Sequence, residues 1–173
     1  MEDGMSMNDP DRCYVAALRI LNHRFNSVAE LRRKLSAKEF DRETIAATIE
    51  RLDAEKWLDD ERFAGLFARA RSLKNIGPQR IRRELVAAGV ADDIAERAVG
   101  ENVEPARERE GVTTLCVKKM RMIARRYGTS YLRTDECRKK LAAYLLNHGY
   151  GPSLVFHTID ECMKIKRVLS AES

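Results

Sequence analysis

Residues 81–99, IRRELVAAGVADDIAERAV, carry the pattern that decides the fold. Apolar side chains recur there at steps of four, five, five and four residues, and residues 31–49, LRRKLSAKEFDRETIAATI, and 141–159, LAAYLLNHGYGPSLVFHTI, repeat the same steps. The fifteen positions are Leu31, Leu35, Phe40, Ile45, Ile49, Ile81, Leu85, Val90, Ala95, Val99, Leu141, Leu145, Tyr150, Val155 and Ile159. A step of four keeps two side chains on one helix face, and the central residue lies where one helix ends and another begins. Each copy therefore predicts a helical hairpin, and the chain is a tandem helical repeat.

The residues around these hairpins predict where the helices begin and end. Residues 27–30 form a capping box, in which the Ser27 hydroxyl and the Glu30 carboxylate accept backbone N–H groups. Gly89 and Gly149 precede two of the central residues, as expected where a helix ends in a left-handed conformation, and Glu39 occupies the same place in the first copy. We expect nine helices in three groups of three, over residues 12–22, 27–38, 41–55, 58–74, 77–89, 91–99, 105–127, 135–148 and 152–168.

A hairpin unit of about fifty residues buries too little surface to be stable alone, so each unit needs its neighbour. The sequence therefore predicts an all-α protein of three tandem three-helix repeats in an elongated array. The expected division is a polar tail at 1–11, repeats at 12–56, 57–103 and 104–169, and a tail at 170–173.

Several function classes lack their signatures. No apolar stretch approaches the roughly 20 residues of a membrane span, and the first eleven residues are polar and acidic, unlike a signal peptide, so we expect a cytoplasmic protein. The three histidines and four cysteines show no zinc or catalytic spacing, so no metal, cofactor or enzymatic activity is expected. Cys137 and Cys162 could face each other across the third hairpin, and we favour reduced thiols. Asp59 and Asp60 are interpreted as helix-cap residues rather than metal ligands.

Basic residues are segregated along the chain, whose net charge is +5. Two windows, 62–83 and 111–134, contain no acidic residue. Exposed helix faces are often basic without a partner, and that interpretation stays open. Surfaces usually intersperse the two signs, however, so two acid-free windows favour a basic binding surface. The candidate binding residues are Arg69, Arg71, Lys74, Arg80, Arg82, Arg83, Lys118, Lys119, Arg121, Arg125 and Arg126. Aromatic residues lie mostly at core spacing, so platforms for base stacking are not indicated.

The second hairpin resembles the RecX family of bacterial recombination regulators. The resemblance is carried by residues 58–64, LDDERFA, by residues 77–85, GPQRIRREL, and by Gly89-Val90. Residues 27–35, SVAELRRKL, are similar to the opening hairpin of that family. The first two hairpins have a basic pair after their first apolar residue, Arg32-Arg33 and Arg82-Arg83. In the third hairpin Ala142 and Ala143 stand at these positions, so positive charge there comes from residues 118–126 and 138–140.

The resemblance implies a curved, right-handed array of three-helix units that acts in homologous recombination, DNA repair and the SOS response. The implied partner is the RecA filament on single-stranded DNA. Binding in the filament groove would inhibit the ATPase, strand-exchange and co-protease activities of RecA. We expect a monomer that contacts no membrane. The alternative is an autonomous DNA-binding protein whose basic helix faces hold phosphates directly, since fold analogy allows both.

Overall fold

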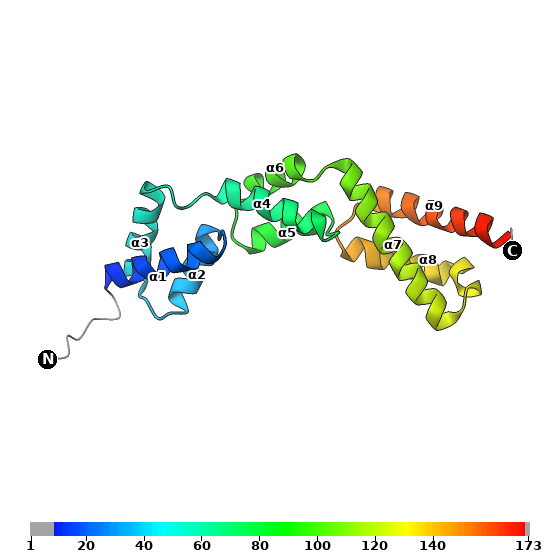
Figure 1. Cartoon of the computed structure of the whole chain (residues 1–173), viewed down its shortest axis with the longest axis horizontal. Coiled ribbons are helices and arrows are strands. Elements are labelled where there is room, and N and C mark those ends of the chain that lie inside the picture. The colour runs from blue at the N-terminus through cyan, green and yellow to red at the C-terminus, as the bar shows by residue number, and fades with distance from the viewer. Residues whose placement is uncertain (1–8, 172–173) are drawn as a thin grey trace. The chain divides into compact units, whose positions relative to one another are not determined.

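The computed structural model describes residues 9–171, with side chains up to residue 164. Nine α-helices and one short 3₁₀ helix, and no strand, occur within that range (Figure 1). Their bounds are α1 (Pro10–His23), α2 (Val28–Ser36), α3 (Arg42–Ala54), α4 (Asp60–Leu73), α5 (Pro78–Ala87), α6 (Asp92–Asn102), α7 (Pro105–Tyr127), η1 (Ser130–Arg133), α8 (Asp135–Asn147) and α9 (Pro152–Ala171). The predicted all-α class and the order of the helices are confirmed for these residues; only η1 is new.

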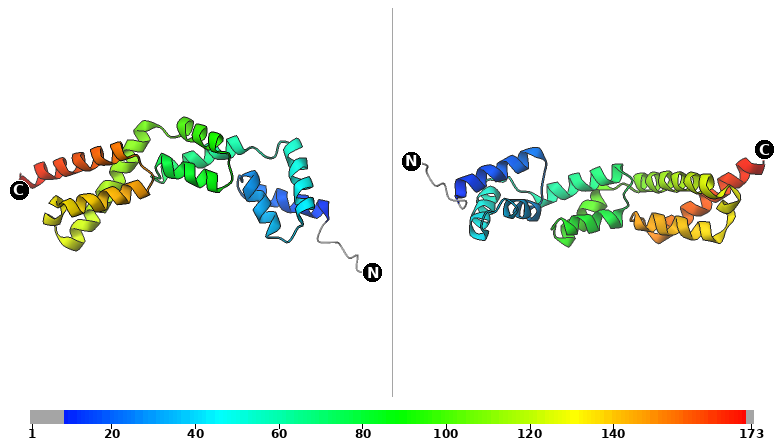
Figure 2. Two further views of the ribbon diagram at one scale, coloured as in Figure 1. Left: turned by 180° about the vertical axis from the view of Figure 1, so that it is seen from behind. Right: turned by 90° about the horizontal axis from the view of Figure 1, so that it is seen from below.

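The helices form two compact units, which we describe separately. Unit 1 contains the described residues up to Leu66 together with Leu85–Ala98, and unit 2 contains Phe67–Glu84 together with the described residues from Val99 onward. In unit 1 the helices α1, α2 and α3 pack on one another. In unit 2 the helices α8 and α9 form an antiparallel hairpin against which α7 packs, as two further views show (Figure 2).

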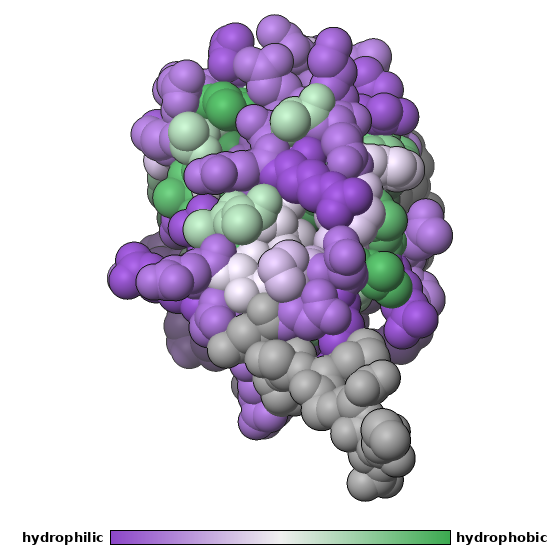
Figure 3. Space-filling view, turned by 90° about the vertical axis from the view of Figure 1, so that its left-hand side faces the viewer, coloured by the Kyte–Doolittle hydropathy of each residue, from purple (hydrophilic) through white to green (hydrophobic). Residues whose placement is uncertain are grey.

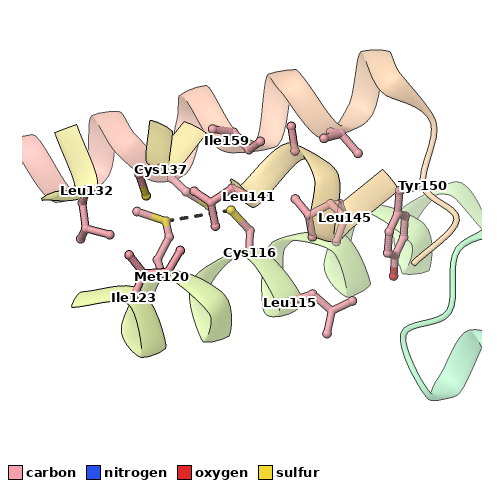
Figure 4. Packing of buried hydrophobic residues seen from close by; sticks show 14 residues of the cluster. Leu115, Cys116, Met120, Ile123, Leu132, Cys137, Leu141, Leu145, Tyr150 and Ile159 are labelled. Atoms are coloured by element: carbon pink, nitrogen blue, oxygen red, sulfur yellow. Dashed lines mark hydrogen bonds between the residues drawn. The ribbon is translucent and has the colours of Figure 1, made fainter. Parts of the chain in front are cut away.

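The repeated apolar pattern supplies the cores of both units. Thirteen of its fifteen residues are buried, and Phe40 and Val99 are half-buried. Leu31, Leu35, Ile45 and Ile49 line the core of unit 1. In unit 2, the third copy packs against the buried face of α7, which contributes side chains such as Leu115, Cys116, Met120 and Ile123 (Figure 4). The hairpin pattern is therefore the core pattern, as predicted.

A hairpin bend in unit 1 packs against the start of α2. Gly89, with φ of +87°, lies so close to α2 that a Cβ atom added to it would be 2.2 Å from the Cβ of Ala29. The Ser27 hydroxyl accepts the N–H of Glu30 at 3.0 Å and donates to the carbonyl of Ala88 at 2.5 Å. The side chain of Asp60 accepts the N–H of Val28 at 3.0 Å. Free N–H groups at the start of α2 are thus satisfied by its own cap and by α4, while the cap also holds the end of α5.

The same device recurs in unit 2, where the bend before α9 packs against the start of α5. The N–H of Gly77 donates to the carbonyl of His148 at 2.8 Å, and that of Gln79 donates to the carbonyl of Gly149 at 3.1 Å. Gly149 has φ of +90°, and an added Cβ atom would lie 2.4 Å from the backbone nitrogen of Arg80. Pro78 has no N–H to satisfy. The carbonyls of this bend therefore cap a helix that belongs to another hairpin.

Tyr150 stabilises the contact between the bend before α9 and the start of α5. Its side chain is buried, its hydroxyl donates to the carbonyl of Asn75 at 3.0 Å, and a Cβ atom added to Gly111 would lie 2.6 Å from that hydroxyl. Arg107 donates to the side-chain oxygen of Asn75 at 3.2 Å. Burial first, and then the carboxylate of Glu108, raise the pKa of Tyr150 to about 12. Asn75, in the loop after α4, is therefore bonded both to the α8–α9 bend, through Tyr150, and to the start of α7, through Arg107.

The capping box is confirmed in part. Ser27 accepts the N–H of Glu30 as predicted, but the carboxylate of Glu30 lies 3.2 Å from the guanidinium of Arg24. Glu39 has φ of +66°, so the left-handed conformation expected from Gly89 and Gly149 is present there.

Replacing Glu39 with glycine is expected to stabilise the protein by up to about 1 kcal/mol. The left-handed conformation costs an L-residue about 1–2 kcal/mol, which glycine avoids. Part of this gain is lost because glycine increases the conformational entropy of the unfolded chain. Urea unfolding should show a higher midpoint for Glu39→Gly. The opposite change at an equivalent bend, Gly89→Ala, should lower the midpoint because of its contact with Ala29. A lower midpoint for Glu39→Gly would show that the bends are not equivalent.

Tyr150→Phe is expected to lower the free energy of unfolding by about 1 kcal/mol at neutral pH, since it removes one buried hydrogen bond. The pKa of Tyr150 is raised in the folded state, so its contribution is complete below the unfolded-state pKa near 10 and is lost as the pH rises toward 12. Urea unfolding at several pH values should show the difference between wild type and variant shrinking over this interval. A difference independent of pH would contradict the assignment.

Candidate functional site

The candidate binding residues lie on three helices of unit 2. Arg69, Arg71 and Lys74 come from α4 and the turn after it, and Arg80, Arg82 and Arg83 come from α5. The other five lie on α7. All eleven are therefore in one compact unit.

On α4 and α5, several of these side chains already have partners. Arg71 lies 2.8 Å from the carboxylate of Glu84, and Arg80 lies 2.9 Å from the other oxygen of the same carboxylate. Arg69 donates to the side chain of Asn102 at 2.7 Å. Arg82 is half-buried and also engaged with its surroundings. Arg71 therefore links α4 to α5, and Arg69 links α4 to α6, whereas Arg80 pairs within α5. The single carboxylate of Glu84 partly neutralises the charges of Arg71 and Arg80.

Lys74 and Arg83 differ from their neighbours. Both are exposed, and neither forms an ion pair with any other residue that the structure describes. The acid-free window 62–83 ends one residue before Glu84. The sequence prediction therefore treated Arg71 and Arg80 as available charges, although both pair with Glu84. Of the candidate residues in this window, Lys74 and Arg83 are the two exposed cations whose side chains have no partner among the described residues.

On α7, three basic residues form one exposed row, which we call the basic stripe: Lys118, Arg121 and Arg125. Their spacing of three and four residues places them on one face of the helix. The core of unit 2 lies against the other face, with Val112, Leu115, Cys116, Met120 and Ile123. Within residues 9–164, no ion pair involves the basic stripe. Its three positive charges are therefore available to a partner.

The stripe ends at a group of aromatic and basic side chains, which we call the tyrosine cluster: Tyr127, Tyr131 and Lys140. The two rings stack with centroids 4.8 Å apart and an interplanar angle of 26°. The Lys140 ammonium donates to the Tyr131 hydroxyl at 2.8 Å, and its nitrogen lies 5.1 Å from the centroid of Tyr127. Arg126 lies 5.3 Å from the same centroid. Tyr127, which is 45% exposed, is an exception to the expectation that aromatic residues lie mostly at core spacing.

Electrostatic contacts fix the protonation states within the cluster. The hydrogen bond with Tyr131 and then the pairing with Glu136 raise the pKa of Lys140, so that its ammonium stays charged. The contacts with Lys140 and then Tyr131 lower the pKa of Glu136, whose carboxylate lies 2.9 Å from Lys140. This exposed pair is neutral overall, and the positive field comes from the arginines around it.

The net charge is concentrated in the same part of unit 2. Residues 118–140 contain nine basic and two acidic residues, a net charge of +7, whereas the whole chain carries +5. The rest of the chain is therefore slightly acidic. Of the basic residues that follow the stripe, Arg138 is paired with Asp160 at 2.7 Å.

The described part of unit 1 offers a weaker candidate. A groove of about 650 Å³ runs beside α1, lined by basic side chains such as Arg12, Arg19 and Lys38 but also by Asp9 and Asp11. The face drawn in Figure 3 is mainly polar, with apolar residues in small separate patches. Mixed signs make this groove a poorer site for a polyanion than the basic stripe.

The described acidic and sulfur-containing side chains make structural contacts. Within the described residues, no group of three or more His, Cys, Asp or Glu side chains could hold a metal ion. Asp59 accepts the N–H of Arg62 at 2.8 Å, so it caps the start of α4 as predicted, whereas Asp60 accepts the N–H of Val28 and so caps α2 instead of its own helix. The four cysteines are buried free thiols, and the sulfur of Cys116 lies 4.0 Å from that of Met120 (Figure 4). Contact with the Cys162 thiol and then burial raise the pKa of Cys116.

Comparison with known proteins assigns the family. Residues 13–52 match the first three-helix domain of RecX, and residues 59–99 match the second. Over 162 residues this chain is 35% identical to regulatory protein RecX of Prosthecochloris aestuarii, an alignment that covers 92% of this chain and 99% of the relative. The chain belongs to the RecX family.

Other RecX proteins agree with this assignment. Regulatory protein RecX of Trichlorobacter lovleyi is 32% identical over 151 residues, which are 86% of this chain and 94% of the relative. The crystal structure of RecX from Lactobacillus salivarius has a TM-score of 0.73 at 25% identity and covers 90% of this chain and 97% of that one. The resemblance predicted from the sequence is confirmed. Both the basic stripe and the tyrosine cluster lie outside the two matched domain ranges. No described helix combines the length and apolarity needed to cross a bilayer.

Charge reversal should destabilise the protein at an arginine that forms an ion pair and have little effect at an exposed arginine without a partner. Arg71→Glu places a carboxylate beside Glu84 and is expected to lower the free energy of unfolding by about 1 kcal/mol, whereas Arg83→Glu should change it by less than about 0.5 kcal/mol. Urea unfolding of the two single variants measures this difference. Equal effects would mean that the pair between Arg71 and Glu84 adds nothing to stability.

Proposed function

We propose that this chain regulates RecA by binding the RecA filament on single-stranded DNA in its helical groove. Binding there inhibits the ATPase, strand-exchange and co-protease activities of RecA, and so acts on recombination, DNA repair and the SOS response. The observation that carries the proposal is the match over nearly the whole chain to a protein named regulatory protein RecX. The implied target of that family is RecA.

The charge distribution of unit 2 supports this partner. A nucleoprotein filament is a polyanion, and complementary charge increases both the encounter rate and the specificity of binding. The basic stripe presents three unpaired charges on one helix face, and Lys74 and Arg83 add two from the α4–α5 region. We therefore place filament binding on the stripe first and on Lys74 and Arg83 second. Arg69, Arg71 and Arg80 are already engaged with Asn102 or Glu84.

In this proposal the protein is not an enzyme, needs no metal or cofactor, and acts as a monomer in the cytoplasm. The reaction that it changes is the ATP hydrolysis of RecA. The alternative, autonomous DNA binding through the basic faces, requires binding to bare DNA that is tight enough to act without RecA and that weakens steeply with salt.

The test is the DNA-dependent ATPase of RecA, titrated with this protein. Wild type should inhibit, and the triple variant Lys118→Glu, Arg121→Glu and Arg125→Glu should need at least about tenfold more protein for half-inhibition, because reversed charges repel a polyanion. Circular dichroism checks that the helices persist, as expected for exposed positions.

The matched control reverses three exposed basic residues of unit 1: Arg32→Glu, Arg33→Glu and Arg42→Glu. Both triple variants change the net charge by the same amount, from +5 to −1. The control should inhibit like wild type. Absence of inhibition by the wild-type protein would refute the function, and equal loss in both variants would refute the place of the surface.

A further inference from the structure

The tyrosine cluster has a feature that core packing does not require. Tyr127 is the last residue of α7, and Gly128, with φ of +83°, redirects the chain so that η1 brings Tyr131 against the same ring. Stacked aromatic rings are usually buried because they carry a large apolar area. Here Tyr127 remains 45% exposed. The fold therefore fixes an aromatic ring at the surface, held by a second ring behind it.

Positive charge surrounds this ring and continues along α7. Arg126 lies 5.3 Å from the ring centroid of Tyr127, and the basic stripe runs back from the cluster along the same helix. From Lys118 to Arg125 the stripe extends about 10 Å, at a rise of 1.5 Å per residue. An exposed ring at the end of a row of cations is the combination by which proteins hold unpaired nucleic acid: bases stack on the aromatic ring and phosphates lie on the cations.

Other polyanions fit these features less well. The bases of a duplex are stacked on one another and cannot reach an aromatic side chain. An acidic peptide binds through its carboxylates and has no base that could stack on the tyrosine ring. Tyr131 and Lys140 are hydrogen-bonded to each other, and Lys140 also pairs with Glu136. The Tyr131 hydroxyl and the Lys140 ammonium are therefore occupied, and the exposed part of the Tyr127 ring remains for stacking, which every base can provide.

We propose that the tyrosine cluster and the basic stripe together form a site for single-stranded DNA, in which a base stacks on Tyr127 and the adjoining phosphates lie along Lys118, Arg121 and Arg125. Binding is independent of base sequence. The site deepens the proposed function, since it would give the protein direct contact with the DNA strand, but it does not require RecA. Its test therefore uses the protein alone.

The experiment measures binding of a fluorescein-labelled oligothymidylate of about 20 nucleotides by fluorescence anisotropy, over a series of salt concentrations. Tyr127→Ala should weaken binding about tenfold, since stacking of one base contributes 1–3 kcal/mol, and should leave the salt dependence unchanged. Tyr127→Phe keeps the ring and should bind like wild type. The double variant Arg121→Ala and Arg125→Ala should lower the slope of log affinity against log salt by about 1.4.

Phe156→Ala is the matched control, because Phe156 is also 45% exposed and lies in the same unit. It should leave the affinity unchanged. The proposal is overturned if Tyr127→Ala binds like wild type, if Tyr127→Phe loses as much as Tyr127→Ala, or if a duplex or polyglutamate binds more tightly than the single strand. RecA inhibition can still be present in any of these cases, so the two proposals fail separately.

Discussion

The fold depends on one contact, made twice, in which a hairpin bend from one part of the chain packs against the first turn of a helix in another. A helix start leaves N–H groups without partners, and they must be satisfied if the end is covered. In unit 2 the carbonyls of His148 and Gly149 satisfy them for α5. In unit 1 the Ser27 cap satisfies one N–H of α2 and binds Ala88 in the same step. Glycine at the bend is required because a side chain would collide with the helix that it covers.

Ion pairs around α5 determine which basic side chains are left without a partner. Around that helix, Arg71 and Arg80 share Glu84, so both arginines are already engaged in ion pairs, and the Arg71 pair joins α4 to α5. On α7, by contrast, the apolar face packs on α8 and α9 and the basic stripe faces outward. The available positive charge is therefore greatest in residues 118–140.

The sequence was sufficient for features that repeat or that depend on neighbours along the chain. Helix ends were predicted to within a few residues, because proline, glycine and capping residues act locally. The left-handed conformation of Glu39 followed from its alignment with Gly89 and Gly149. Contacts between distant residues were not predictable in this way. Nothing in the spacing pairs Arg71 with Glu84, and the stacking of Tyr127 on Tyr131 depends on Gly128 and on a 3₁₀ helix that has no apolar period.

The claim that the basic stripe is the binding surface is tested most directly by hydrogen–deuterium exchange. The exchange of this protein is measured alone and bound to RecA filaments on single-stranded DNA. It needs no substitution and reports on every part of the chain at once. Our account predicts that the filament slows exchange in peptides covering residues 118–133, and that peptides from α1 to α3 are little changed. Protection confined to α1–α3, near the groove beside α1, would contradict it.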